Sequence, residues 1–184
     1  IRDSVCPDCK TKLVRVIGES NHYCLNSDNC KQQIIGSIQH FVSRNAMDIE
    51  GLGGETISLL YDSGLIKSIA DLYDLNKKDL IPLDRMAEKS ISNIFEGLEK
   101  SKKQPFDKVL FGLGIRFVGN TVAKKITNSI TSIEKLKNST FEELILIDEI
   151  GERIAESLIK YFKSTKKLIL VNRLKISGLN LDTT

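Results

Sequence analysis

A short turn sequence recurs four times along this chain at nearly constant spacing. Counted from the small residue that closes each turn, the intervals are 34, 32 and 32 residues. An apolar segment precedes each turn, and a helical pattern of apolar and small residues follows it. A period in this range is typical of supersecondary units that bury their apolar faces against one another. The sequence therefore predicts four helix-hairpin-helix units, with turns at Gly51-Leu52-Gly53, Arg85-Met86-Ala87, Phe117-Val118-Gly119 and Glu149-Ile150-Gly151.

A turn of this kind can bind phosphate through its backbone. A closing residue without a β-carbon lets the main chain adopt left-handed angles and lets N–H groups approach a ligand closely. The helix that follows presents N–H groups without an internal partner, and its dipole favours an anion there. Such contacts bind the backbone of nucleic acid and read little base sequence. An ordinary glycine cap explains any single turn equally well, but four turns in phase favour a platform that follows a duplex.

The candidate phosphate-binding residues are the turn residues and the cations beside them. The second turn departs from the others because alanine closes it, and a left-handed backbone at that residue would cost roughly 1–2 kcal/mol. We expect either a differently shaped turn or packing that tolerates the strain. The predicted set is Gly51, Gly53, Arg85, Ala87, Lys89, Arg116, Gly119, Lys124, Lys125, Gly151 and Arg153.

Charge ranks the four turns. The third is the strongest candidate, because Arg116, Lys124 and Lys125 surround it, and the second turn follows. In the fourth, the arginine is opposed by two acidic residues. The first turn lies among acidic residues and is predicted to be structural. An aspartate at Gly119 is therefore expected to weaken nucleic-acid binding more than an aspartate at Gly53.

All four cysteines lie within the first 30 residues, at Cys6, Cys9, Cys24 and Cys30. Thiolates suit tetrahedral zinc, and the C-x2-C spacing of the first pair places two sulfurs on one metal. Four sulfurs leave no open coordination position, so the predicted zinc is structural. Two disulfides would need an oxidising compartment, and a redox C-x-x-C expects a βαβ context that this segment lacks. His22 is an alternative ligand, but the four cysteines already complete the site.

The pattern along the chain predicts a mainly α protein with a small four-cysteine zinc ribbon in front. We expect a zinc-finger module over residues 1–32, in which residues 12–17 have β character. So small a module cannot bury enough apolar surface alone, so the metal replaces the missing core. Apolar residues at helical spacing predict a connecting helix within residues 33–46. Residues 47–184 then form an all-α array of four helix-hairpin-helix motifs, without a long alternating strand pattern.

Composition limits the possible functions. Hydrophobic residues make up 41% of 184 residues, which is ordinary for a packed protein. No apolar run is long enough for a membrane span and no signal-peptide pattern opens the chain, so we expect a cytoplasmic protein. Basic residues outnumber acidic ones by 12 to 8 over residues 111–184, whereas acidic residues outnumber basic ones by 12 to 9 over residues 47–110. The C-terminal half is thus the part whose field attracts a polyanion.

The order of a four-cysteine ribbon and four hairpins resembles the C-terminal half of bacterial NAD-dependent DNA ligases. The resemblance covers nearly the whole chain. Beyond the cysteines, it rests on three runs around the first three turns. These are Asp48-Ile49-Glu50-Gly51-Leu52-Gly53, Leu83-Asp84-Arg85-Met86-Ala87-Glu88-Lys89-Ser90 and Leu113-Gly114-Ile115-Arg116-Phe117-Val118-Gly119.

The resemblance implies a monomeric enzyme that seals nicks in double-stranded DNA in replication and repair. Such an enzyme uses NAD and Mg²⁺ to adenylate a lysine in a Lys-x-Asp-Gly motif, and then the 5′-phosphate at the nick. No such motif occurs in this sequence. The family's NAD-recognition region, nucleotidyltransferase core and oligonucleotide-binding barrel would precede Ile1, and its BRCT domain would follow Thr184. We therefore expect a piece of a larger protein that binds DNA, helps to encircle it and does not ligate by itself.

Two other functions are compatible with the same residues. The hairpins occur in other repair and recombination proteins, such as excision-nuclease subunits and branch-migration factors, although a four-cysteine ribbon beside four repeats argues against them. A zinc-stapled helical module that binds protein is the second alternative, and a weak salt dependence of binding would indicate it. Independent catalysis has little support, because His22 and His40 lie in no recognisable catalytic constellation.

Overall fold

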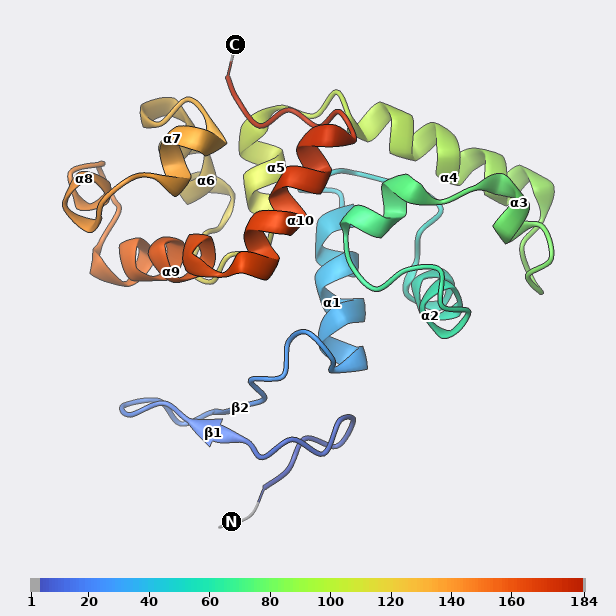
Figure 1. Ribbon diagram of the computed structural model, residues 1–184, viewed down its shortest axis with the longest axis horizontal. Coiled ribbons are helices and arrows are strands. Elements are labelled where there is room, and N and C mark those ends of the chain that lie inside the picture. The colour runs from blue at the N-terminus through green and yellow to red at the C-terminus, as the bar shows by residue number, and fades with distance from the viewer. Residues whose placement is uncertain (1–3, 184) are drawn as a thin grey trace.

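The computed structural model describes residues 4–183 (Figure 1). The outermost residues of the predicted zinc-finger and helical domains, 1–3 and 184, lie outside this range. A two-stranded antiparallel ribbon of β1 (Val14–Arg15) and β2 (His22–Tyr23) forms a small lobe at the N-terminal end. Helix α1 (Lys31–Val42) begins directly after Cys30 and leads from this lobe into the helical array. The mainly α fold class with a small four-cysteine ribbon is confirmed.

The helical array is a series of hairpins followed by a closing helix. The first helices of the hairpins are α1, α3 (Lys77–Leu80), α5 (Phe106–Gly112) and α8 (Phe141–Ile145). The second helices are α2 (Gly54–Asp62), α4 (Glu88–Ser101), α6 (Asn120–Ser129) and α9 (Glu152–Lys163). Between the hairpins lie a 3₁₀ helix (Ala70–Asp74) and α7 (Ile133–Lys137), and α10 (Thr165–Ile176) closes the array.

One continuous core joins the hairpins. Within residues 4–183 it runs from Ile34 on α1 to Leu181 near the C-terminus and contains no residue of the zinc lobe. Phe41 of α1 and Phe106 of α5 are among its largest fully buried side chains, and α1 packs against both α2 and α5. The helical array thus has an apolar core of its own, whereas the ribbon does not.

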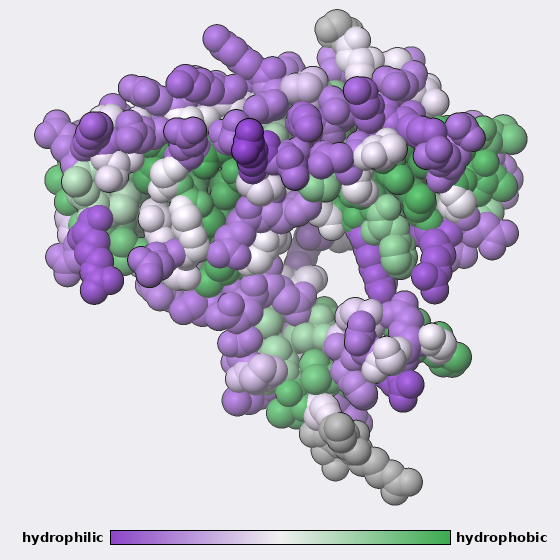
Figure 2. Space-filling view, turned by 180° about the vertical axis from the view of Figure 1, so that it is seen from behind, coloured by the Kyte–Doolittle hydropathy of each residue, from purple (hydrophilic) through white to green (hydrophobic). Residues whose placement is uncertain are grey.

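Hydrophilic residues cover much of the face of the array shown in Figure 2, and the zinc lobe projects below it. The two lobes meet through hydrophilic side chains beside an opening. Among the described residues, no helix is both long and apolar enough to cross a membrane.

Candidate metal centre and nucleic-acid interface

The four cysteine sulfurs converge in the zinc lobe, beside the start of α1. The sulfurs of Cys6 and Cys30 lie 3.8 Å apart, those of Cys9 and Cys24 lie 3.5 Å apart, and all four lie within 4.8 Å of one another. Sulfurs bound to one tetrahedral zinc at about 2.3 Å would lie about 3.8 Å apart. The donor set and its spacing therefore fit a structural Zn²⁺ ion.

The local structure explains why these sulfurs converge. A tight turn follows Cys6, in which the backbone N–H groups of Cys6 and Lys10 bond to Thr11 O and Cys6 O at 2.8 and 3.0 Å. Cys30 is the N-cap of α1 and is almost fully buried. The disulfide alternative is wrong, because bonded sulfurs lie only about 2.0 Å apart and all four cysteines are free. His22 lies outside the sulfur cluster, so the four cysteines form the site.

The thiols also have unequal acidities. Hydrogen bonding with Thr11, first through its side chain and then its backbone, lowers the pKa of Cys9 to about 6. The backbone of Asn26 favours the thiolate of Cys24, but burial and the neighbouring thiols raise the pKa of Cys24 to about 11. Packed thiolates repel one another, and a divalent cation would offset that repulsion.

The four hairpin turns have similar geometries, and all four begin with a left-handed residue. In three of them the middle residue donates its N–H to the carbonyl three residues earlier, as Val118 does to Ile115 O at 3.0 Å. The middle residues of the first, third and fourth turns are buried in the core. The first residue of each turn has a left-handed backbone, at Gly51 (φ 88°), Arg85 (φ 68°), Phe117 (φ 67°) and Glu149 (φ 65°).

The prediction that the closing residue adopts left-handed angles was wrong. Gly53, Ala87, Gly119 and Gly151 have φ values of −75°, −72°, −83° and −83°, which any residue adopts. The left-handed position lies two residues earlier, and there three of the four turns tolerate a side chain. The expected strain at Ala87 is therefore absent, and its turn has the same shape as the others.

The closing residues serve instead as exposed N-caps of the second helices. None of the four provides a side-chain cap, whereas side chains cap α3, α7, α8 and α10. A β-carbon added at Gly53, Gly119 or Gly151 would meet nothing within 4 Å. Neither the backbone nor the packing of this chain requires glycine at these positions, so each turn leaves room for a ligand at a helix N-terminus.

The predicted cations have different surroundings. Arg85 and Lys89 are exposed beside the second turn, and Lys124 is exposed on α6. Lys125, by contrast, lies 3.2 Å from an oxygen of Asp148 and 2.9 Å from one of Glu149 in the fourth turn.

Arg116 lies 3.2 Å from Glu19 in the zinc lobe, and Arg153 faces the Phe117 ring at 5.5 Å. These contacts across the structure could not be read from the sequence, because the partners of Arg116 and Lys125 are far away along the chain.

The first turn of each second helix differs in charge. Glu55, Glu88 and Glu152 lie in the first turns of α2, α4 and α9, whereas α6 has no acidic residue there. An acidic side chain at a helix N-terminus competes with a bound anion for the same dipole. The start of α6 is therefore the most favourable of the four for an anion.

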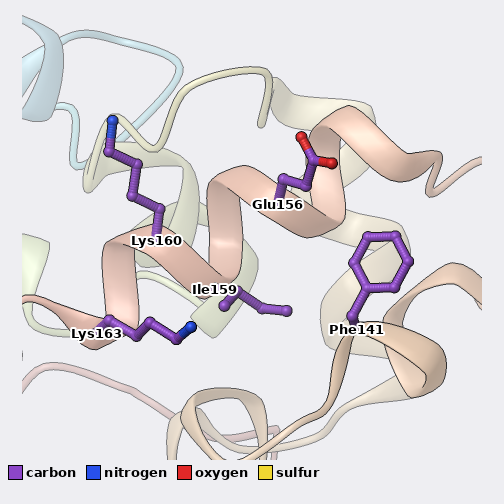
Figure 3. A pocket seen from close by; sticks show the side chains of 5 residues that line it. All are labelled: Phe141, Glu156, Ile159, Lys160 and Lys163. Atoms are coloured by element: carbon purple, nitrogen blue, oxygen red, sulfur yellow. The ribbon is translucent and has the colours of Figure 1, made fainter.

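A hollow beside α9 is lined by Phe141, Glu156, Ile159, Lys160 and Lys163. Figure 3 shows that the Glu156 and Lys160 side chains project from one side of α9 and those of Ile159 and Lys163 from the other. The lining of this hollow combines apolar surface with side chains of opposite charge, and none of the predicted site residues lines it.

Models of known protein families match both the zinc lobe and the helical array. The family model of the NAD-dependent DNA ligase C4 zinc finger domain matches residues 5–31. A SAM-like helix-hairpin-helix tandem matches residues 43–100, which hold the first two turns, and a helix-hairpin-helix motif matches residues 108–171, which hold the other two.

The similarity to curated proteins extends over nearly the whole chain. The chain is 52% identical to a DNA ligase of Flavobacterium psychrophilum over 96% of its length, and 54% identical to one of Flavobacterium johnsoniae over 97%. The resemblance to DNA ligases is confirmed. A DNA ligase of Bacteroides fragilis is 53% identical over 96% of the chain. This ligase-like chain spans about a quarter of the length of these relatives, 26–27%.

Proposed function

We propose that this chain is the part of an NAD-dependent DNA ligase that binds duplex DNA without sequence specificity. The observation that carries the proposal is shared by the four turns: each second helix starts at an exposed residue that provides no side-chain cap. Free N–H groups and the positive end of the helix dipole favour phosphate at such positions. Because the phosphate backbone is the same at every base pair, contacts of this kind position a duplex without reading it.

The donors in this proposal are the backbone N–H groups of the first three residues of each second helix. The first intrahelical bond is made by the fourth residue, as from Ala123 N to Gly119 O at 2.9 Å. The missing β-carbon at Gly119 lets a phosphate oxygen come close to these donors. The start of α6 would bind phosphate most strongly, because no acidic side chain competes there.

Cationic side chains would add attraction around these donors. Arg85 and Lys89 flank the second turn, and Lys124 and Arg153 lie in the first halves of α6 and α9. The sequence also predicted Arg116 and Lys125 as phosphate contacts. Their charges already face carboxylates in the structure, so we do not assign them direct contacts.

In the intact protein this segment would help to encircle a nicked duplex while other domains carry out the chemistry. NAD and Mg²⁺ would bind to those domains, in which NAD supplies the adenylyl group when bound. The four cysteines would hold Zn²⁺ and keep the zinc lobe folded between those domains and the hairpins. We further propose that this segment does not ligate by itself, and that the protein is a monomer that acts in the cytoplasm.

Equilibrium binding tests this proposal. The zinc-loaded chain is titrated with nicked, intact and single-stranded DNA at several salt concentrations, with folding and zinc content checked on the same sample. We expect duplex binding that weakens steeply with salt, because each phosphate contact contributes about −0.9 to the slope of log K against log salt. A preference for nicked DNA would indicate that the segment senses the lesion.

Two results would contradict the proposal. Absence of duplex binding by the folded, zinc-loaded chain at low salt would favour a role in binding protein. Binding that prefers a branched or single-stranded DNA to a nicked duplex would favour another repair or recombination protein.

A further inference from the structure

The side chain of Arg116 lies at the junction between the zinc lobe and the helical array. Its Nη2 atom is 3.2 Å from both carboxylate oxygens of Glu19. Its guanidinium carbon lies 4.9 Å from the ring centre of Tyr23 and 4.8 Å from that of Phe117. One cation from the third turn thus contacts a carboxylate and an aromatic ring of the zinc lobe, and it also contacts the ring of its neighbour in the turn.

Glu19, the partner of Arg116, is held in place by other residues of the zinc lobe. The Tyr23 hydroxyl donates to Glu19 Oε2 at 2.5 Å, and Arg15 Nε donates to the Glu19 carbonyl at 2.7 Å. The Glu19 side chain is only 19% exposed. The Tyr23 hydroxyl first, and then the charge of Arg116, lower the pKa of Glu19. Glu19 therefore faces the arginine as a carboxylate, in a position that the Tyr23 hydroxyl also holds.

The third turn is also held by the fourth hairpin. Ser157 Oγ of α9 donates to the carbonyl of Arg116 at 2.6 Å. The guanidinium of Arg153, at the start of the same helix, lies over the Phe117 ring. The left-handed residue of this turn, Phe117, is thus fixed between α9 and Arg116.

We propose that Glu19 and Tyr23 form a receptor for Arg116, through which the zinc lobe fixes the third hairpin turn for DNA binding. Arg116 is then a positioning residue that stays on Glu19 in the complex, and the phosphate is bound by the backbone N–H groups that follow Gly119. A turn that is already fixed in its binding conformation loses less entropy when the ligand binds. The consequence for DNA affinity rests on the proposed function, whereas the docking of the two lobes does not.

A second ion pair spans the same junction and provides a matched control. Lys166 Nζ of α10 lies 3.1 Å from Asp28 Oδ2, and these side chains are 70% and 46% exposed. Within residues 4–183, this pair has no aromatic partner and involves none of the four hairpin turns. Asp28→Asn removes this pair and changes the charge of the zinc lobe by the same amount as Glu19→Gln. It leaves the contact between Arg116 and Glu19 intact.

A double-mutant cycle in DNA binding tests the proposal. Arg116→Gln removes the ion pair and the cation–π contacts and should raise the Kd for a nicked duplex roughly five- to tenfold, whereas Glu19→Gln removes only the ion pair and should raise it by a smaller factor. The double variant should bind no more weakly than Arg116→Gln alone. Tyr23→Phe should shift the Kd in the same direction by less, and Asp28→Asn should leave it unchanged. The salt slope should stay the same throughout.

The opposite pattern would overturn the proposal. If Arg116 binds a phosphate in the complex, Arg116→Gln reduces the salt slope by about 1, and Glu19→Gln leaves the affinity unchanged or increases it. Equal losses in Glu19→Gln and Asp28→Asn would also refute it, because they would indicate a general effect of charge.

A measurement without DNA separates the docking from the proposed function. With Co²⁺ in place of Zn²⁺, pseudocontact shifts of the amides that follow Gly119 report where the third turn lies relative to the metal. Glu19→Gln should reduce these shifts by averaging, whereas Asp28→Asn should not. Unchanged shifts in Glu19→Gln would refute the docking. Absence of DNA binding by the unsubstituted chain would instead refute the proposed function. It would not affect the conclusion from the pseudocontact shifts that the zinc lobe docks on the third turn.

Discussion

Two glycines of the first hairpin turn have different physical roles, although only one residue separates them. Gly51 has a φ of 88°, and a β-carbon there would lie 3.2 Å from Ile94 Cγ1 of α4. Gly53 has an ordinary φ of −75°, and a β-carbon there would meet nothing within 4 Å. The fold therefore favours glycine at the first position and shows no such preference at the second.

The stabilities of two alanine variants should reflect this difference. Gly51→Ala should lower the free energy of unfolding by about 1–2 kcal/mol, because a left-handed backbone is unfavourable with a β-carbon. Gly53→Ala should change it by less than about 0.5 kcal/mol, as is usual for exposed substitutions. Chemical denaturation of both variants measures the difference. Equal losses would contradict the assignment of the left-handed position to the first residue of the turn.

An aspartate in place of the closing glycine should separate stability from binding. Gly119 is the N-cap of α6, where aspartate is a preferred cap, so Gly119→Asp should stabilise the fold by a few tenths of a kcal/mol. The same carboxylate would repel phosphate, and we expect the Kd for duplex DNA to rise about tenfold or more, a change of about 1.4 kcal/mol.

Gly53→Asp is the matched control, since α2 begins in the same way but already has Glu55 in its first turn. It should gain similar stability and lose less affinity. Thermal unfolding and fluorescence anisotropy measure the two quantities. Equal losses of affinity in the two variants would remove the ranking of the turns.

At the scale of the elements, the repeat in the sequence predicted the four turns and their second helices, because apolar periodicity in those helices follows the core directly. It did not predict α3 and α7, which are only four and five residues long. Segments this short contain too few apolar residues to display a period. A signal was present in their N-caps, since the side chains of Asn76 and Ser132 accept hydrogen bonds from Lys78 N and Lys135 N.

The zinc lobe should depend on its metal, whereas the helical array should not. Among the described residues, the shared core begins at Ile34 and contains none from the lobe, and α1, the first helix, begins at Lys31. Chelation of zinc, or Cys9→Ser, should therefore disorder residues 5–30 and leave the far-UV circular dichroism of the helices nearly unchanged. Amide NMR spectra locate the loss. Cooperative unfolding of the helices on chelation would contradict an independent core.

Over the whole molecule, charges from distant segments meet in ways that the sequence could not reveal. The sequence counted Arg116, Lys124 and Lys125 alike as cations around the third turn. In the folded chain Arg116 faces Glu19 of the zinc lobe, and Lys125 faces Asp148 and Glu149 of the fourth turn. A count of charges along the chain therefore overstates the attraction of this turn for phosphate. The folded structure leaves Lys124 as the cation of the three that faces no carboxylate within residues 4–183.

The adjacent lysines of α6 provide a test of that distinction in duplex binding. Lys124 is exposed, and no ion pair is found for it within residues 4–183, whereas Lys125 joins the third hairpin to the fourth turn. Lys124→Gln should weaken binding and reduce the salt slope by about 1, as expected for a lost phosphate contact. Lys125→Gln should leave the slope unchanged, because its charge is already matched by two carboxylates. Affinities at several salt concentrations decide between them, and a reduced slope in Lys125→Gln would show that DNA displaces the two carboxylates from this lysine.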